Sequence, residues 1–332
     1  YGVFFRDKYM HRPIGYLDVY KDRIILVTYD GSIFYSNNIN EIKNNNLSLN
    51  KINVLNYDFD FDYEDKIYYR NIKIRDILVD EDKLYIVTNG RQKIDPSLKT
   101  GDFLDKNFHG STNILVGKLN LDETNIRLEN FFSPGKEKYI VNDWSHTGGR
   151  LVKYKNSSFL LTVPDYEIEY EKMRELINSD KSTIGKILLI KNGKSKIFSY
   201  GHRNPQGLFY DQENDLIFET EHGPQGGDEI NLVKYKKHYG FPDASYGTRG
   251  AGLDKFRKHK KHGFAEPLTY WWPYNCGMSE IIKVDSNFNE KWKNYTLLNA
   301  CLSGSFNRGE SIYRWEFDIE KEKLIKKNKY HI

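Results

Sequence analysis

The sequence contains few cysteines, prolines and methionines, and what it lacks narrows the classes of protein it can belong to. Its 332 residues include two Cys, nine Pro and three Met. Cys276 and Cys301 form no Cys-x-x-Cys pair, so a zinc or iron–sulfur site built on cysteines is not expected. Whether these two cysteines form a disulfide is left open. No apolar run approaches the roughly 18–20 residues of a membrane span.

The chain has no large excess of charge of either sign. It carries 50 basic and 46 acidic side chains, a formal net charge of +4. This balance implies no strong field for a polyanion, so a nucleic-acid partner is not expected. One run, Lys255–His262, is locally basic, and we interpret it as a solvated loop rather than a contact with nucleic acid or a membrane. Because the chain begins at Tyr1, it is expected to be a mature form or an excised fragment.

Short strands are abundant, and helical signal is scant. The 25 Tyr and 19 Phe favour strands, and the segment 171–178 is the main candidate for a helix, of about two turns. A strand–turn–strand phrase begins at Gly15, Ile74, Gly149 and Gln206, about 57 to 75 residues apart, with a weaker copy near Gly277. This period predicts propeller blades of about four strands each. A sandwich pair or a solenoid explains the spacing less simply.

Two polar, glycine-rich loops flank the apolar segment Asp215–Thr220. Glycines let a backbone turn sharply or approach a ligand closely, while Arg and Asn provide planar donors for carboxylates and carbonyls. Loops this dense in polar groups and held by a strand are typical of binding sites. Their polar side chains are His202, Arg203, Asn204 and Gln206 in the first loop, and Glu221, His222, Asp228 and Glu229 in the second.

These loops carry a resemblance to a known family. Gly201–Leu208, Glu221–Asn231 and Tyr239–Pro242 resemble motifs of the soluble quinoprotein aldose (glucose/sorbosone) dehydrogenases. The combined order and spacing of the motifs are specific, whereas any one motif alone would not be. Similarity is strong from about residue 145 to 242 and weaker on either side. Three further segments match the family: His146–Leu151, Ile184–Ile187 and Leu268–Pro273.

The resemblance implies an all-β fold, a six-bladed β-propeller that uses pyrroloquinoline quinone (PQQ) and calcium. About five blades are recognisable, so residues 1–332 are expected to form a single propeller domain that lacks its C-terminal closing blade. The family's last Arg-x-Arg motif would follow Ile332. Because propellers close to remove sheet edges, we favour a fragment over an irregular sixth blade.

The resemblance assigns roles to residues of the catalytic and cofactor sites. His146 would be the general base that takes the proton of the sugar's anomeric hydroxyl while hydride passes to the quinone; the ordinary pKa of histidine, near 6.5, suits that task. Arg203 and Asn204, with Gln206 nearby, would hold the oxygens and carboxylates of the quinone. Arg308 is aligned with a basic residue that the family directs at a cofactor carboxylate.

The calcium ion is expected in the second loop. Gly223 and Pro224 would offer backbone carbonyls, which are hard oxygen ligands, and the ion would polarise the quinone as a Lewis acid. Asp228 and Glu229 either tie down this loop, bind a second ion or are ordinary capping and solvated groups.

The resemblance also implies the substrate and the surroundings of the enzyme. Tyr270 and Trp272 would pack on the face of a small sugar, which would be oxidised at its anomeric carbon to a lactone. The electron acceptor and the oligomeric state stay unknown, and a periplasmic or secreted location is expected.

The sequence departs from the family in ways that keep alternatives open. The family's usual Gly-Asp turn is replaced by Val163–Asp165, and the opening glycine-rich motif is reduced to Arg12–Leu17. One alternative is therefore a propeller of the same descent that binds a saccharide or a protein without redox chemistry. A calcium-dependent lactonase would need acids at several strand starts, and these are not seen. The enzyme is favoured by the intact set of His146, Arg203, Asn204 and Gln206, because a pure binding module has no need for a base and a cofactor clamp together.

Overall fold

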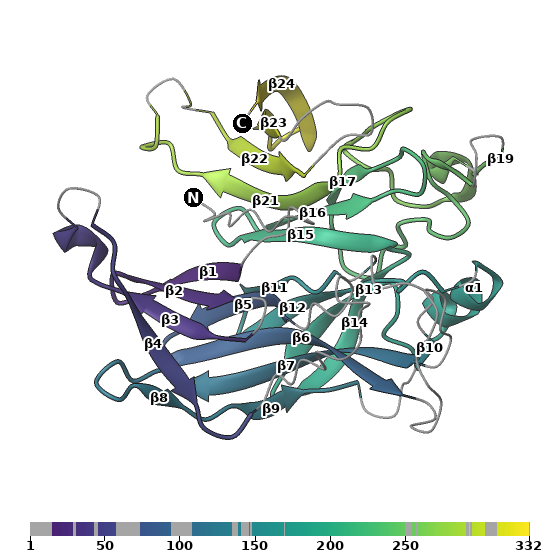
Figure 1. Ribbon diagram of the computed structural model, residues 1–332. Helices are drawn as coiled ribbons and strands as arrows, with labels where there is room; N and C mark the ends of the chain where they lie inside the picture. Colours follow the sequence, from purple (N-terminus) through teal and green to yellow (C-terminus); the bar gives the residue numbers. More distant parts are fainter. Residues whose placement is uncertain are drawn as a thin grey trace, which may run out of the picture. The chain divides into compact units, whose positions relative to one another are not determined.

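The computed structural model shows an all-β protein, as predicted. It describes residues 15–28, 31–42, 46–57, 74–93, 108–134, 139–140, 146, 148–168, 170–249, 254–256, 258–289, 292, 294–302 and 311–331. These residues form five sheets of four or five strands and one two-stranded sheet (Figure 1). Among them, no helix has the length and apolar character needed to cross a membrane.

The chain divides into two compact units, which are described separately. The first comprises Tyr1–Ser145 with Asn192–Lys194, and the second comprises His146–Lys191 with Ser195–Ile332. Three expectations stay predictions: that the chain forms a single propeller domain, that the propeller has six blades, and that the closing blade is missing.

The first unit contains two five-stranded sheets. One has the order β1-β2-β3-β4-β8, in which β8 pairs in parallel with β4; the other has the order β10-β7-β6-β5, with β9 also paired to β7. The short 3₁₀ helix η1 spans Ile39–Glu41. The strands are β1 (Gly15–Tyr20), β2 (Arg23–Thr28), β3 (Ile33–Ser36), β4 (Leu49–Val54), β5 (Ile74–Asp80), β6 (Lys83–Lys93), β7 (Phe108–Lys118), β8 (Asn125–Ile126), β9 (Glu129–Phe132) and β10 (Tyr139–Ile140).

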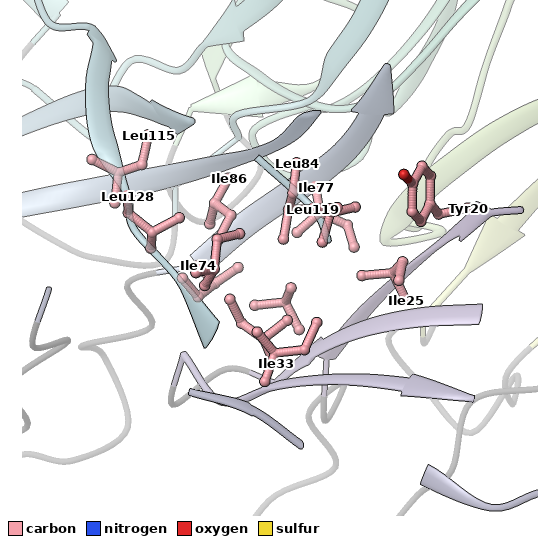
Figure 2. Packing of buried hydrophobic residues seen from close by; sticks show 13 residues of the cluster. Tyr20, Ile25, Ile33, Ile74, Ile77, Leu84, Ile86, Leu115, Leu119 and Leu128 are labelled. Atoms are coloured by element: carbon pink, nitrogen blue, oxygen red, sulfur yellow. The ribbon is translucent and has the colours of Figure 1, made fainter. Parts of the chain in front are cut away.

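Aliphatic side chains from both sheets form the core of the first unit (Figure 2). Ile25 on β2 and Ile33 on β3 pack in one cluster with Ile74 on β5 and Ile86 on β6, and all four are fully buried. Burying a side chain of this kind stabilises a protein by roughly 1.5–3 kcal/mol. Branched aliphatic side chains therefore help to hold the two sheets together.

The second unit contains three four-stranded sheets, in the orders β11-β12-β13-β14, β15-β16-β17-β20 and β21-β22-β23-β24, and the two-stranded sheet β18-β19. The strands are β11 (Leu151–Tyr154), β12 (Ser158–Val163), β13 (Lys186–Lys191), β14 (Lys194–Tyr200), β15 (Asn204–Asp211), β16 (Leu216–His222), β17 (Glu229–Leu232), β18 (Thr248–Arg249), β19 (Asp254–Lys255), β20 (Thr269–Tyr270), β21 (Met278–Val284), β22 (Thr296–Cys301), β23 (Ser311–Asp318) and β24 (Lys323–His331).

The repeat that the sequence predicts is confirmed. Each of its five copies begins within two residues of the first strand of a sheet, namely β1, β5, β11, β15 and β21. The pairs β1–β2, β5–β6, β11–β12, β15–β16 and β21–β22 are antiparallel, as strand–turn–strand phrases require.

The predicted helix is also present, as α1 (Tyr170–Asn178). It buries Met173, Leu176 and Ile177 on one face. Of the basic run, Lys258 and Lys260 are exposed as expected of a solvated loop, but His259, at the start of the 3₁₀ helix η3 (His259–His262), is buried.

Cys276 and Cys301 form a disulfide, which answers the question that the sequence left open. Their Cα atoms are 5.2 Å apart, and the bridge joins the start of β21 to the end of β22 across 25 residues. A loop of this length is expected to contribute about 3 kcal/mol, mainly by restricting the unfolded chain.

We expect the double variant Cys276→Ser/Cys301→Ser to be less stable than the wild type by about 3 kcal/mol. Urea unfolding under oxidising conditions measures the difference. Wild-type protein treated with a reductant is the control and should unfold like the variant. Equal stability of oxidised wild type and variant would contradict a stabilising role for the bridge.

Candidate active site

The candidate site lies in the second unit, at the ends of neighbouring strands. His146 precedes β11, and Asp165 follows β12. Arg203 lies in the loop between β14 and β15, and Gly223 begins the loop between β16 and β17. His146 and Arg203, which are 57 positions apart in the sequence, are thereby brought into contact.

His146 is held between an anion and a cation. Its Nδ1 is 2.7 Å from Asp165 Oδ1, and its Nε2 is 2.9 Å from a terminal nitrogen of Arg203. A guanidinium has no acceptor, so Nε2 must accept its hydrogen bond and Nδ1 must carry the proton donated to Asp165. The contacts thus define a neutral imidazole whose lone pair is on Nε2, the form that a general base needs.

Asp165 is the functional residue that the sequence motifs missed. It is buried, and it accepts a second hydrogen bond from the backbone N–H of Glu167 at 3.1 Å. Burial alone would raise the pKa of Asp165, but His146 and then Arg203 outweigh it and hold the pKa below its usual value. Asp165 therefore stays ionised beside His146. In the sequence, the only feature that drew attention to Asp165 is the unusual turn Val163–Asp165.

Arg203 links His146 to the predicted calcium loop. One terminal nitrogen donates to the carbonyls of His222, at 3.1 Å, and Gly223, at 2.6 Å, while the other reaches His146. Its backbone N–H donates to Glu221 at 2.6 Å. Sequence reasoning placed Arg203 at the site but did not anticipate these carbonyl contacts.

Asn204 and Gln206 form a second polar group next to this set. The Oδ1 of Asn204 accepts hydrogen bonds from the N–H of Gly148, at 3.2 Å, and from the Gln206 amide, at 2.9 Å. The backbone carbonyl of Gln206 accepts from Arg150 at 2.6 Å. Within the described residues the Asn204 amide nitrogen donates to no side chain or carbonyl, so it is free to bind a ligand.

The loop that begins at Gly223 is organised by Asp228. One carboxylate oxygen accepts from Gly223 N–H at 2.9 Å, and the other accepts from Cys276 N–H at 2.6 Å and Gly277 N–H at 2.8 Å. Asp228 is fully buried. Of the roles that the sequence left open for this acid, the structure shows that of tying down the loop.

Gly223 has no space for a larger residue. A Cβ at this position would lie 2.3 Å from the carbonyl oxygen of Gly226. Any side chain would therefore push the loop open and displace its carbonyls. The Pro224 carbonyl accepts a weak hydrogen bond, 3.3 Å, from the Asn275 side chain.

Aromatic side chains lie beside this loop. Tyr270 and Trp272 are 45% and 48% exposed, so both can contact a ligand. The ring of Tyr270 stacks on that of Tyr246 with centroids 3.8 Å apart. Trp272 packs over Gly226, where an added Cβ would be 2.8 Å from its ring. The intervening Trp271 instead packs against Trp315 in the core.

Two predicted elements cannot be placed. Arg308 lies outside the described residues, as does the segment 12–14 of the reduced opening motif. The roles assigned to Arg308 and to that motif stay predictions.

The sequence of the chain matches a family of sugar oxidoreductases. The profile of the family described as Glucose / Sorbosone dehydrogenase matches residues 105–331. The chain therefore belongs to the glucose/sorbosone dehydrogenase family.

Individual relatives agree with this membership. Aldose sugar dehydrogenase YliI of Escherichia coli is 27% identical over 175 residues, which are 49% of this chain and 47% of YliI. The chain spans less than half the length of the curated relatives it matches. Among solved structures, the apo form of the soluble aldose sugar dehydrogenase of E. coli has a TM-score of 0.69 at 17% identity, covering 94% of this chain and 84% of that one.

The PQQ-bound aldose sugar dehydrogenase of Streptomyces coelicolor has a TM-score of 0.61 at 17% identity, covering 93% of this chain and 78% of that one. These likenesses show that the fold is shared.

Proposed function

We propose that this protein is a quinoprotein oxidoreductase that oxidises an aldose at the anomeric carbon to a lactone, using PQQ and Ca²⁺. Family membership supports the class of reaction. The observation that carries the proposal is the contact of His146 with both Asp165 and Arg203, because it combines an oriented base with a cation suited to an anionic cofactor.

The residues present fit this cofactor, which is a tricarboxylate. Arg203 and Asn204 would bind its oxygens, with Gln206 orienting the Asn204 amide, and Arg308 is proposed for a further carboxylate. The carbonyls of Gly223 and Pro224 would bind the calcium ion. In support, the Gly223 carbonyl already faces a positive group, the Arg203 guanidinium, at 2.6 Å.

Arg203 must change partners when the site is loaded. Its guanidinium cannot remain on the Gly223 carbonyl while a calcium ion binds there, because the two positive charges repel each other. It must also leave His146 Nε2, which would otherwise have no lone pair for the substrate. Cofactor carboxylates would offer Arg203 a new partner, so cofactor binding would also release the base.

The chain's own residues then perform the proton transfer. When bound, PQQ supplies a two-electron acceptor for the hydride of the anomeric carbon, and Ca²⁺ polarises it. His146 Nε2 would take the proton of the anomeric hydroxyl, so that the existing C–O single bond can become the carbonyl double bond of the lactone as the hydrogen on the anomeric carbon leaves as hydride. Asp165 holds the ring in position and stabilises the imidazolium that results.

The sugar would bind against exposed aromatic surface. Tyr270 and Trp272 offer apolar faces beside the calcium loop, and rings of this kind pack on the apolar face of a sugar. A periplasmic or secreted location is proposed as well, since the Cys276–Cys301 disulfide is typical of an oxidising compartment.

Reconstitution tests the proposal. Protein that includes any missing C-terminal segment would be supplied with Ca²⁺ and PQQ, and reduction of an artificial dye would be followed with a panel of aldoses. Turnover that requires both PQQ and an aldose supports the enzyme. A protein that binds saccharide but no quinone would favour the binding module instead.

Removal of calcium is expected to abolish dye reduction by the loaded enzyme. Without the ion, the carbonyls of Gly223 and Pro224 lose the positive centre that would grip and polarise the cofactor. Activity measured after treatment with a chelator should return on addition of Ca²⁺ and not of Na⁺. Full activity in metal-free protein would rule out the calcium site.

A further inference from the structure

A buried acidic face lies on β16 and β17, separate from the carbonyls proposed for calcium. Glu219 and Glu221 are two positions apart on β16 and so point to the same side of the sheet. Their register partners on β17 are Asn231 and Glu229, which share that side. None of the four is more than 4% exposed. Three ionised carboxylates in a protein interior are costly unless a counter-charge compensates them.

The described part of the chain supplies no such counter-charge. Among the described residues, no Lys or Arg side chain forms an ion pair with any of the three carboxylates. Asn231 donates to Glu219 at 3.0 Å and to Glu221 at 3.3 Å, and the backbone N–H of Arg203 donates to Glu221. The second oxygen of Glu219 is buried with no hydrogen-bond partner in the described part of the chain.

His202 directs an unused nitrogen at these carboxylates. The side chain is fully buried and stacks on Tyr239 with ring centroids 4.7 Å apart. Its Nε2 is 2.9 Å from Ser199 Oγ, whereas its Nδ1 has no hydrogen-bond partner. Nδ1 lies 3.9 Å from Glu219 and 3.8 Å from Glu221, which is too far for hydrogen bonds.

We propose that His202, Glu219 and Glu221 form a binding site for a divalent transition-metal ion of the zinc type. Their ligand atoms all lie within 4.8 Å of one another. Around a tetrahedral ion with bonds of about 2.1 Å, ligand atoms are about 3.4 Å apart. The distances from His202 Nδ1 to Glu219 and Glu221, 3.9 Å and 3.8 Å, would therefore shorten by about half an ångström on binding.

The chemistry of the ligands selects the ion. One imidazole nitrogen with carboxylates suits Zn²⁺, whereas Ca²⁺ prefers oxygen alone. Ser199 would accept the Nε2 proton of His202 and so keep the lone pair on Nδ1, as neighbours of metal-binding histidines commonly do. Asn231 Oδ1, also buried without a partner among the described residues, would become a fourth ligand if its amide turned.

Such an ion would have a structural role beneath the candidate active site. Glu221 would bind the ion with one oxygen while the other holds the Arg203 backbone, so the ion would anchor the loop that carries the proposed cofactor clamp. The inference does not depend on sugar oxidation, and its test uses no activity.

Metal content provides the test. The chelator-treated full chain would be incubated with Zn²⁺, desalted and analysed by mass spectrometry for bound metal. We expect one tightly bound equivalent and a higher melting temperature. Glu219→Gln should lose this equivalent. Glu229→Gln is the matched control, since it removes an equally buried carboxylate that faces His259 at 3.8 Å instead, and it should retain the ion.

Crystals of the zinc-loaded wild type give a measurement that needs no variant. An anomalous difference peak between His202 Nδ1 and the two carboxylates would support the site, even if Glu219→Gln fails to fold. No peak there, zinc retained equally by Glu219→Gln, or zinc lost equally from Glu229→Gln would overturn the proposal.

Discussion

Replacing His146 with Ala is expected to lower kcat by roughly 100- to 10,000-fold, the usual range for loss of general acid–base help. This corresponds to about 3–5 kcal/mol of barrier. The reason is geometric: the lone pair of the imidazole is on Nε2, on the side of Arg203, and the ring is held there by Asp165. Dye-linked turnover at saturating PQQ and sugar measures the effect.

The control for His146→Ala is the affinity for PQQ. It should change little, because Arg203, Asn204 and the calcium loop would hold the cofactor. Arg203→Ala should show the reverse pattern, with cofactor affinity reduced roughly 10- to 150-fold by loss of a charge-assisted hydrogen bond. Near-normal turnover of His146→Ala with saturating quinone would falsify the assignment.

Asp165→Asn is expected to lower kcat by roughly 100- to 10,000-fold while the fold and PQQ affinity remain. The variant keeps the shape of the side chain but removes the negative charge 2.7 Å from His146 Nδ1. The imidazolium formed during proton transfer then has no counter-charge, and the ring is free to adopt the wrong tautomer, as in serine-protease triads. Turnover measured at saturating PQQ and over a range of sugar concentrations tests this role.

The split between kcat and KM separates this role from a merely structural one. Loss of the carboxylate removes the partner of His146 Nδ1 and leaves the groups proposed for cofactor and sugar in place, so kcat should fall while KM changes little. A raised KM with an unchanged kcat would contradict the positioning role. Because the pKa of Asp165 is depressed by His146 and Arg203 despite burial, its contribution to stability is present above about pH 4, the unfolded value. That contribution is lost as pH falls through the folded pKa, so the stabilities of variant and wild type should converge in acid.

The sequence by itself determined the strand repeat and the position of the polar loops. Alternating apolar residues and acidic turns are local signals, so the starts of the sheets could be predicted near Gly15, Ile74 and Gly277 before any packing was known. The motif around Arg203 could be recognised from the sequence for the same reason, since its residues are consecutive in the chain.

Only the tertiary structure decided how these segments combine. Asp165 meets His146 from 19 positions away, and Cys276 meets both Cys301 and Asp228. A side chain's neighbours depend on which strand ends the packing of sheets brings together, and a single sequence does not record those distances. The acidic face under His202 was hidden for the same reason, because only the packing of the sheets shows that these strand carboxylates are buried beside one another, where they could hold a cation.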